Sequence, residues 1–186
     1  MKILYIHGYN GTPDGPKLDM LRKEYQSATI FAPQHDGVPD HVHDLLDGIA
    51  STMDDPEDVI IGNSLGGFWA NLFSLRYGVP ALLINPVVSP LKALETLGCP
   101  FAVEYAPYEK EVKADAISPR TVLLAEDDEV LCYRDAFEFF SGICRVELLK
   151  SGGHGMNDPE SIAIIRDSIP SLFASAIAWG IHNDND

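Results

Sequence analysis

The chain has 186 residues and a formal net charge of −15 at pH 7. Nucleic acids and anionic membrane surfaces bind basic protein faces, so this charge argues against both as partners. Hydrophobic residues make up 46% of the sequence and charged residues 22%, a balance typical of globular proteins. The length suits one domain with a full hydrophobic core, and we expect a single domain over residues 1–186.

Apolar runs and cysteines point to the compartment. The apolar run at the start is too short for a secretory signal, and no other run reaches membrane-spanning length. Cys99, Cys132 and Cys144 lie far apart and lack the C-x-x-C spacing of a zinc or redox site. Reduced thiols explain them better than a disulfide framework does. We therefore expect a cytoplasmic protein.

Short apolar, β-rich runs alternate along the chain with apolar positions at helical spacing. The runs predict strands over residues 2–6, 28–32, 59–61, 81–84, 121–125 and 144–149. The helical spacing predicts helices over residues 18–25, 42–53, 65–77 and 133–141, and a last helix after residue 158. Asp40 and Asp158 are expected to cap the second and last helices, and Pro170 to kink or restart the last one.

This alternation predicts an α/β fold of about six mostly parallel strands with helices on both faces, because the strands lack the polar alternation of a half-exposed sheet. Residues 86–119 carry five prolines and are expected to be irregular, with a short helix over Leu91–Leu97. They predict a small cover over a site rather than a large lid domain. Phe101, Tyr105 and Tyr108 either line an apolar pocket there or anchor the segment.

A serine follows the third predicted strand in the pattern Gly62-x-Ser64-x-Gly66. This spacing is that of a nucleophile elbow, where a tight strand-to-helix turn lifts a serine hydroxyl clear of the sheet. The glycines let strand and helix close around the bend, and the first N–H groups of the helix favour an oxyanion. The spacing alone also fits a helix start that merely packs tightly, or a loop that cradles a phosphate.

A serine hydroxyl needs a base and an orienting acid. In this fold class both lie beyond the carboxyl ends of the strands, in the chain order serine, acid, histidine. The acid candidates follow the fifth predicted strand and are Glu126, Asp127, Asp128 and Glu129. Asp128 is favoured, because it lies far enough past the strand to turn back over the sheet edge. Asp127 is the second candidate, and a merely solvated loop is the alternative.

The histidine candidate is His154, which lies between Gly153 and Gly155 directly after the last predicted strand. Flanking glycines allow the loop to bring an imidazole close to another loop, and the position suits the expected chain order. The alternative is a surface histidine. His154 is therefore the predicted catalytic base.

The other histidines carry weaker signals. Three of them lie among carboxylates, and these six residues are His35, Asp36, Asp40, His41, His43 and Asp44. The spacing lacks the further ligands of a dinuclear metal site, so we interpret this stretch as a solvated acidic helix start and predict no metal. His182 lies in a polar stretch that is expected to be a frayed tail.

An oxyanion needs two N–H donors. One is the residue after the serine, Leu65, and the other comes from the loop after the first core strand. His7-Gly8 ends that strand, which makes Tyr9 the predicted second donor and Asn10 its alternative. The competing interpretation of His7-Gly8 is a strand that simply ends in a turn.

Taken together, these residues resemble the bacterial YqiA-type esterases, which are small α/β-hydrolases. The matching blocks keep the same order along the chain and are residues 4–10, 62–68, 84–88, 128–131 and 152–154. The resemblance implies a triad of Ser64, Asp128 and His154, and it favours Asp128 over Asp127. It also implies a core without the first two strands of larger α/β-hydrolases, and esterase activity on short acyl esters. Residues 99–116 and 155–157 depart from the family's usual pattern.

We therefore predict a serine esterase that forms an acyl-enzyme on Ser64 and needs no metal or cofactor. Its expected partner is a small-molecule ester. A thioesterase or amidase would use the same residues, since the acyl-enzyme chemistry is shared. The alternative from another class is a non-catalytic doubly wound domain in which residues 62–67 cradle a phosphate, although no lysine follows the glycines there.

Overall fold

A computed structural model describes residues 1–112 and 118–183. Six parallel strands form one sheet in the order β2-β1-β3-β4-β5-β6. The strands are β1 (Lys2–Ile6), β2 (Thr29–Phe31), β3 (Val59–Asn63), β4 (Ala81–Ile84), β5 (Arg120–Ala125) and β6 (Arg145–Leu149). The predicted α/β class and parallel sheet are confirmed. The bounds of β1 and β4 are as predicted, and those of the other strands differ by one or two residues.

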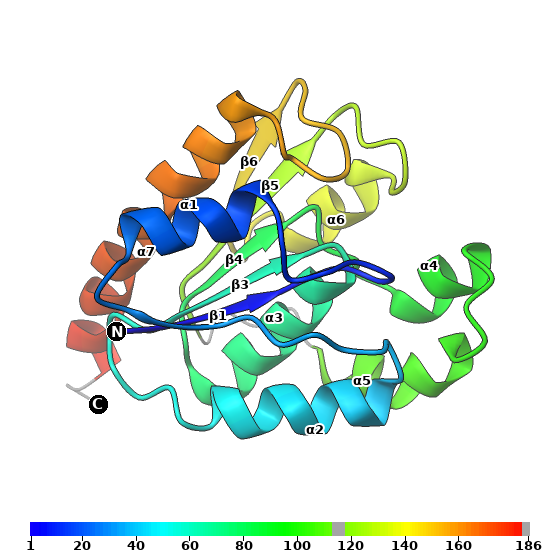
Figure 1. The fold of residues 1–186 in the computed structure, drawn as a ribbon, viewed down its shortest axis with the longest axis horizontal. Helices are drawn as coiled ribbons and strands as arrows, with labels where there is room; N and C mark the ends of the chain where they lie inside the picture. Colours follow the sequence, from blue (N-terminus) through cyan, green and yellow to red (C-terminus); the bar gives the residue numbers. More distant parts are fainter. Residues whose placement is uncertain (113–117, 184–186) are drawn as a thin grey trace.

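Helices cover both faces of the sheet (Figure 1). One face carries α1 (Pro16–Glu24) and α7 (Pro159–Asn183). The other carries α2 (Pro39–Ala50), α3 (Leu65–Tyr77) and α6 (Tyr133–Phe140). Because all six strands are parallel, their carboxyl ends lie at one edge of the sheet, towards the right in Figure 1, and the loops after them gather there.

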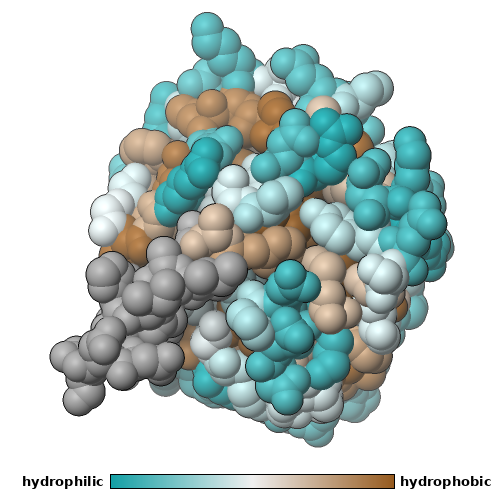
Figure 2. Space-filling view, turned by 90° about the vertical axis from the view of Figure 1, so that its left-hand side faces the viewer, coloured by the Kyte–Doolittle hydropathy of each residue, from teal (hydrophilic) through white to brown (hydrophobic). Residues whose placement is uncertain are grey.

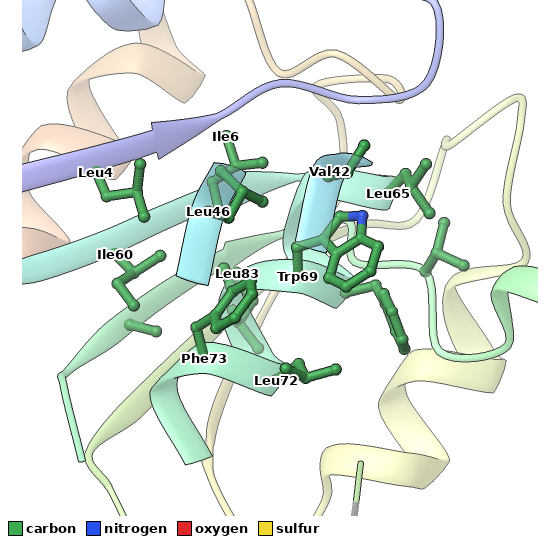
Figure 3. Close-up of a cluster of buried hydrophobic side chains, with 14 of the residues drawn as sticks. Leu4, Ile6, Val42, Leu46, Ile60, Leu65, Trp69, Leu72, Phe73 and Leu83 are labelled. Carbon is green, nitrogen blue, oxygen red and sulfur yellow. The ribbon is translucent and has the colours of Figure 1, made fainter. Parts of the chain in front are cut away.

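The core has two layers because successive side chains of each strand point to opposite faces. Leu4 and Ile6 of β1 lie with Trp69 and Phe73 of α3 on one side, as Figure 3 shows. Ile3 of β1 belongs to the second layer, against α1 and α7. β3, which leads into the predicted elbow, is buried along its whole length. Packing on both faces thus fixes the strand that presents Ser64.

The helix starts agree only partly with the predicted caps. Asp158 accepts the N–H of Glu160 at 3.1 Å and of Ser161 at 3.0 Å, which confirms its capping role. The prediction for Asp40 is wrong, because α2 begins one residue earlier, at Pro39, and Asp40 lies inside its first turn. Proline suits the first helical position, since the N–H that it lacks would have no acceptor within the helix.

The helix does not restart at Pro170, because α7 runs without interruption through that residue to Asn183. Ile165, Ile169 and Leu172 are buried against the sheet and hold the helix on both sides of the proline. His182 accordingly lies within α7 rather than in a tail.

The cover segment is more regular than predicted. It contains α4 (Pro90–Thr96), the 3₁₀ helix η1 (Ala102–Tyr105) and α5 (Ala106–Glu111), whereas residues 113–117 lie outside the described residues. These helices lie at the carboxyl edge of the sheet (Figure 1). The predicted helix over Leu91–Leu97 is confirmed as α4, shifted by one residue.

The aromatic residues of the cover anchor it to the core. Tyr105 is fully buried and its hydroxyl donates to the Gly37 carbonyl at 2.8 Å. The Tyr108 hydroxyl donates to Asp40 at 2.6 Å, and its ring packs against Trp69. Of the two interpretations of these aromatic residues, the structure favours anchoring.

The surface at the end opposite the carboxyl edge of the sheet mixes hydrophilic and hydrophobic residues. Figure 2 views the end where the chain begins, and hydrophilic residues there surround smaller hydrophobic patches. Within the described ranges, no helix combines the length and apolar character needed to cross a membrane. Cys99, Cys132 and Cys144 are all free thiols.

Candidate active site

Ser64 stands at a sharp turn between β3 and α3. Its backbone has φ 57° and ψ −121°, a conformation that costs a residue with a side chain of the order of 1–3 kcal/mol. The turn is held from both sides, because the Ser64 N–H donates to the Ile84 carbonyl at 2.9 Å and the Ser64 carbonyl accepts from Val87 at 3.0 Å. The end of β4 and the loop after it thus fix a strained serine at the carboxyl edge of the sheet.

The glycines around Ser64 are required by close backbone contacts. A Cβ on Gly62 would lie 2.1 Å from the carbonyl oxygen of Gly66, and a Cβ on Gly66 would lie 2.1 Å from that of Ile6. Both distances are far below contact, so no other residue fits without moving the backbone. Tight packing therefore explains the glycines, while the positive φ concerns the serine itself.

Asp128 and His154 form a close pair. The imidazole Nδ1 of His154 lies 3.0 Å and 2.9 Å from the two carboxylate oxygens of Asp128. The side chain of Asp128 is 1% exposed and that of His154 is 17% exposed. The carboxylate also accepts the N–H groups of Val130 and Leu131, each at 2.8 Å. These contacts fix Nδ1 as the proton-bearing nitrogen and leave Nε2 free to accept a proton.

The surroundings keep Asp128 ionised. Burial by itself raises the pKa of its carboxyl group, but the hydrogen bonds from His154 and from two backbone N–H groups outweigh burial and hold the pKa below its usual value. An ionised carboxylate beside Nδ1 stabilises the imidazolium that forms when Nε2 takes a proton.

The neighbouring carboxylates hold the histidine loop rather than the imidazole ring. Asp127 accepts the N–H of Gly153 at 2.9 Å and of Gly152 at 3.4 Å. Glu129 accepts the backbone N–H of His154 at 2.9 Å. Of the two acids weighed from the sequence, the structure brings Asp128 to the imidazole and gives Asp127 a supporting position.

Asn85 links the serine side of the site to the histidine side. It directly follows β4, and its amide donates to the carbonyls of Gly153 at 3.0 Å and His154 at 3.1 Å. Its side-chain oxygen accepts the N–H of Ala125 at 2.9 Å. Sequence reasoning assigned Asn85 no role. The available signal was a polar residue immediately after a fully buried strand.

The loop after β1 meets the elbow directly. A Cβ on Gly8 would lie 3.1 Å from the Ser64 Cβ and 3.6 Å from its hydroxyl oxygen. Leu65 is the first residue of α3, where N–H groups have no acceptor within the helix. The backbone around Leu65 and the Gly8–Tyr9 peptide thus border the space next to the Ser64 hydroxyl.

The interpretation of His35, His41 and His43 as a solvated stretch is wrong for two of them. His43 packs against the rings of Trp69 and Tyr108, and only the exposed His41, paired with Asp36 at 2.9 Å, suits it. His35 stacks on His7 with ring centroids 3.8 Å apart. The described residues contain no group of three or more histidine, cysteine or acidic side chains placed to hold a metal.

Lys17 supports the far side of the histidine loop. It lies in the first turn of α1, and its ammonium donates to the Gly155 carbonyl and, at 2.7 Å, to the side-chain oxygen of Asn157. The residue is 4% exposed. Burial lowers the pKa of Lys17 to about 8, against the opposing effect of the negative charge of Asp158.

This lowered pKa gives a pH-dependent stability. Between pH 8 and the ordinary lysine value of 10.5 the unfolded chain binds more protons at Lys17, so the unfolding free energy rises with pH. The penalty for burying the charge is complete below about pH 8 and is relieved towards pH 10.5. Relative to Lys17→Met, the wild-type protein is therefore expected to gain stability between pH 7 and 10. Urea unfolding at several pH values measures this, and parallel profiles for the two proteins would contradict it.

A cavity of about 540 Å³ adjoins the site between α4 and the segment from Asp128 to α6. Its apolar wall includes Val87, Leu97 and Leu131, and Asn85 and Asp128 belong to its lining. The volume lies within the range of small-molecule sites. The cavity therefore offers room for an apolar group beside the residues that hold Ser64 and His154.

The fold is that of the α/β-hydrolases, since alpha/beta hydrolase domain-containing protein 10 from mouse superposes with a TM-score of 0.65 at 17% identity, over 94% of this chain and 90% of that one. Est1E from Butyrivibrio proteoclasticus superposes with a TM-score of 0.69 at 13% identity, over 95% of this chain and 88% of that one. The ydeN gene product of B. subtilis superposes with a TM-score of 0.66 at 17% identity, over 93% and 98% of the two chains. At such identities the likeness concerns the fold.

The sequence pattern of UPF0227, described as an uncharacterised protein family, matches residues 2–161, and the chain belongs to this family. A UPF0227 protein of Shewanella woodyi is 33% identical over 98 residues, which cover 47% of this chain and 52% of that protein. One from Vibrio atlanticus is 26% identical over 95 residues. The chain thus spans about half the length of the curated relatives that it matches.

Proposed function

We propose that the protein is a serine esterase, with Ser64 as nucleophile, His154 as base and Asp128 as the orienting acid. The observation that carries the proposal is the close Asp128–His154 pair, whose loop is bound by Asn85 directly after β4, together with the strained Ser64 turn that hydrogen-bonds to the last residue of β4. A helix start that only packs tightly requires neither this pair nor a serine at positive φ.

In the proposed reaction the Ser64 oxygen attacks the ester carbonyl while His154 Nε2 takes the hydroxyl proton. The carbonyl oxygen becomes an oxyanion, which the N–H groups of Leu65 and Tyr9 stabilise. The imidazolium then gives its proton to the leaving alcohol as the carbon–oxygen bond breaks, and an acyl-enzyme remains on Ser64. Water, deprotonated by His154, attacks this ester and releases the carboxylic acid and the free serine.

The cavity beside Asp128 indicates the substrate class. Its apolar wall suits an uncharged acyl or alcohol group of a small-molecule ester. Each buried methylene contributes about 0.8 kcal/mol, or roughly a fourfold gain in kcat/KM. The free cysteines of the described chain suit the reducing setting of the cytoplasm, which we propose as its location.

Rapid-mixing kinetics with p-nitrophenyl acetate and butyrate test the proposal. Because acylation precedes hydrolysis, we expect a burst of p-nitrophenol equal in concentration to the enzyme when deacylation is the slower step. kcat/KM is expected to be several-fold higher for the butyrate. A wild-type protein with neither ester turnover nor reaction with a fluorophosphonate would refute the proposal.

Two alternatives use the same geometry. A thioesterase or amidase would show higher kcat/KM on a matched thioester or anilide than on the ester, so parallel assays with one acyl group separate these activities. A phosphate-binding role for residues 62–67 is disfavoured, because Asp128 and Glu129 place negative charge at the same edge of the sheet. Nucleotide bound to purified protein without any ester turnover would support that role.

A further inference from the structure

The stacked pair of His7, which is buried, and His35, which is half-buried, lies outside the triad and beside the oxyanion loop. His7 directly follows β1 and is 2% exposed. His35 comes from the loop after β2, and the two rings stack with an interplanar angle of 7°. The pair is in contact with the loop that the proposed function uses, but neither ring takes part in the reaction steps above.

Hydrogen bonds connect this pair to the backbone of the oxyanion loop. His7 Nδ1 lies 2.8 Å from the Gly8 carbonyl oxygen, which can only accept, so Nδ1 carries the proton. His35 Nε2 lies 3.2 Å from the His7 carbonyl oxygen and is a donor for the same reason. The backbone N–H of His35 donates to His7 Nε2 at 3.4 Å. The backbone of each histidine thus fixes the tautomer of the other's ring, and the stacked rings hold each other in place.

Both rings are held neutral. Burial lowers the pKa of His35 to about 4 and lowers that of His7 as well. The Nδ1 atom of His35 is buried and has no hydrogen-bond partner among the described residues, so a proton there would have no acceptor. The tautomers that donate to the loop are therefore the stable ones at neutral pH.

The direction of the Gly8 carbonyl determines the direction of the Tyr9 N–H. The Gly8 oxygen accepts from His7 Nδ1 and from the Gly11 N–H at 3.0 Å. In a planar trans peptide the C=O and the next N–H point in opposite directions. With its oxygen turned towards His7 and Gly11, the Gly8–Tyr9 peptide directs its N–H away from them, and Gly8 itself borders the Ser64 hydroxyl.

We propose that His7 and His35 are positioning residues that hold the Gly8–Tyr9 peptide with the Tyr9 N–H turned towards the oxyanion at Ser64. This inference rests on the proposed esterase function. His7 acts directly on the peptide, and His35 acts through His7. Neither residue touches the substrate.

The test compares substitutions that keep or remove the donor. His7→Phe keeps an aromatic ring for stacking but loses Nδ1–H, whereas the amide of His7→Asn can donate from nearly the same place. Loss of an oxyanion donor costs about 10²–10³-fold in kcat. We expect a fall of about 10²-fold in kcat for p-nitrophenyl butyrate in His7→Phe, with KM unchanged, and recovery of at least tenfold in His7→Asn. Because His154 is untouched, the acid limb of the kcat/KM profile is expected at the same pH.

Two substitutions of His35, from the loop after β2, give an independent test. We expect kcat to fall about tenfold in His35→Phe and to change little in His35→Gln. His41→Phe is the matched control, because His41 is exposed and pairs only with Asp36. Circular dichroism checks the fold of each variant. Wild-type kcat in folded His7→Phe or His35→Phe would overturn the positioning role, as would equal losses in the phenylalanine and amide variants. An inactive wild-type protein would instead refute the proposed function.

Discussion

If the proposed function holds, replacing Ser64 with alanine is expected to abolish labelling by a fluorophosphonate and to lower kcat for p-nitrophenyl butyrate by about 10⁶-fold, as loss of the nucleophile does in a serine protease. The probe forms a covalent bond to an activated serine oxygen, and alanine has no such oxygen. Labelling followed by intact-protein mass spectrometry, together with steady-state kinetics, measures both effects.

The fold of Ser64→Ala is expected to persist. The Ser64 side chain makes no capping hydrogen bond to α3, and alanine meets the same backbone strain at φ 57°. The thermal midpoint should therefore stay close to the wild-type value. Ser27→Ala, at an exposed position, is the control that should keep full labelling. A Ser64→Ala protein that still takes up the probe would exclude Ser64 as the nucleophile.

The centre of the sheet was predictable because β1, β3, β4 and β5 are buried on both faces. β1 places Ile3 in one core layer and Leu4 in the other, so the whole run is apolar and stands out from the amphipathic helices. The helix ends were less predictable. At the start of α2 the sequence allows two helix starts, one with Pro39 as the first helical residue and one with Asp40 as the cap, and the structure has the first.

The elbow was predictable because its chemistry is local. Gly62, Ser64 and Gly66 lie within one turn of chain, and the contacts that exclude a Cβ come from the bend and the adjacent β1. The acid was harder to assign, because four carboxylates follow β5 in succession. Only the three-dimensional arrangement of the loops after β5 and β6 shows that Asp128 faces the imidazole while Asp127 faces backbone N–H groups.

The role of His35 lay beyond the sequence because it depends on the order of strands in the sheet. The pairing of β2 with β1 brings the loops after these two strands together. His35 is thereby stacked on His7, 28 positions earlier in the chain. From the sequence alone His35 is one of several histidines among carboxylates, and nothing local distinguishes the half-buried, stacked His35 from the exposed His41.

Asp128→Asn is expected to lower kcat for ester cleavage by about 10⁴-fold, and Asp127→Asn by no more than about tenfold. An amide at position 128 turns a donor towards His154 Nδ1, which favours the tautomer with the proton on Nε2, and that nitrogen can then no longer accept the Ser64 proton. Asp127 is exposed and accepts only backbone N–H groups of the histidine loop, which an asparagine oxygen can still accept. Kinetics of both variants on p-nitrophenyl butyrate give the ranking.

The two substitutions form a matched pair, since each replaces a carboxylate by an amide in the same loop. Glu129→Gln is a third member, because Glu129 also accepts only a backbone N–H of His154, and a small loss is expected there. If loop support were the dominant function of these acids, all three variants would lose comparable activity. A larger loss in Asp127→Asn than in Asp128→Asn would give the orienting role to Asp127. The structure predicts a steep drop confined to Asp128, because its carboxylate contacts the imidazole that must exchange the proton.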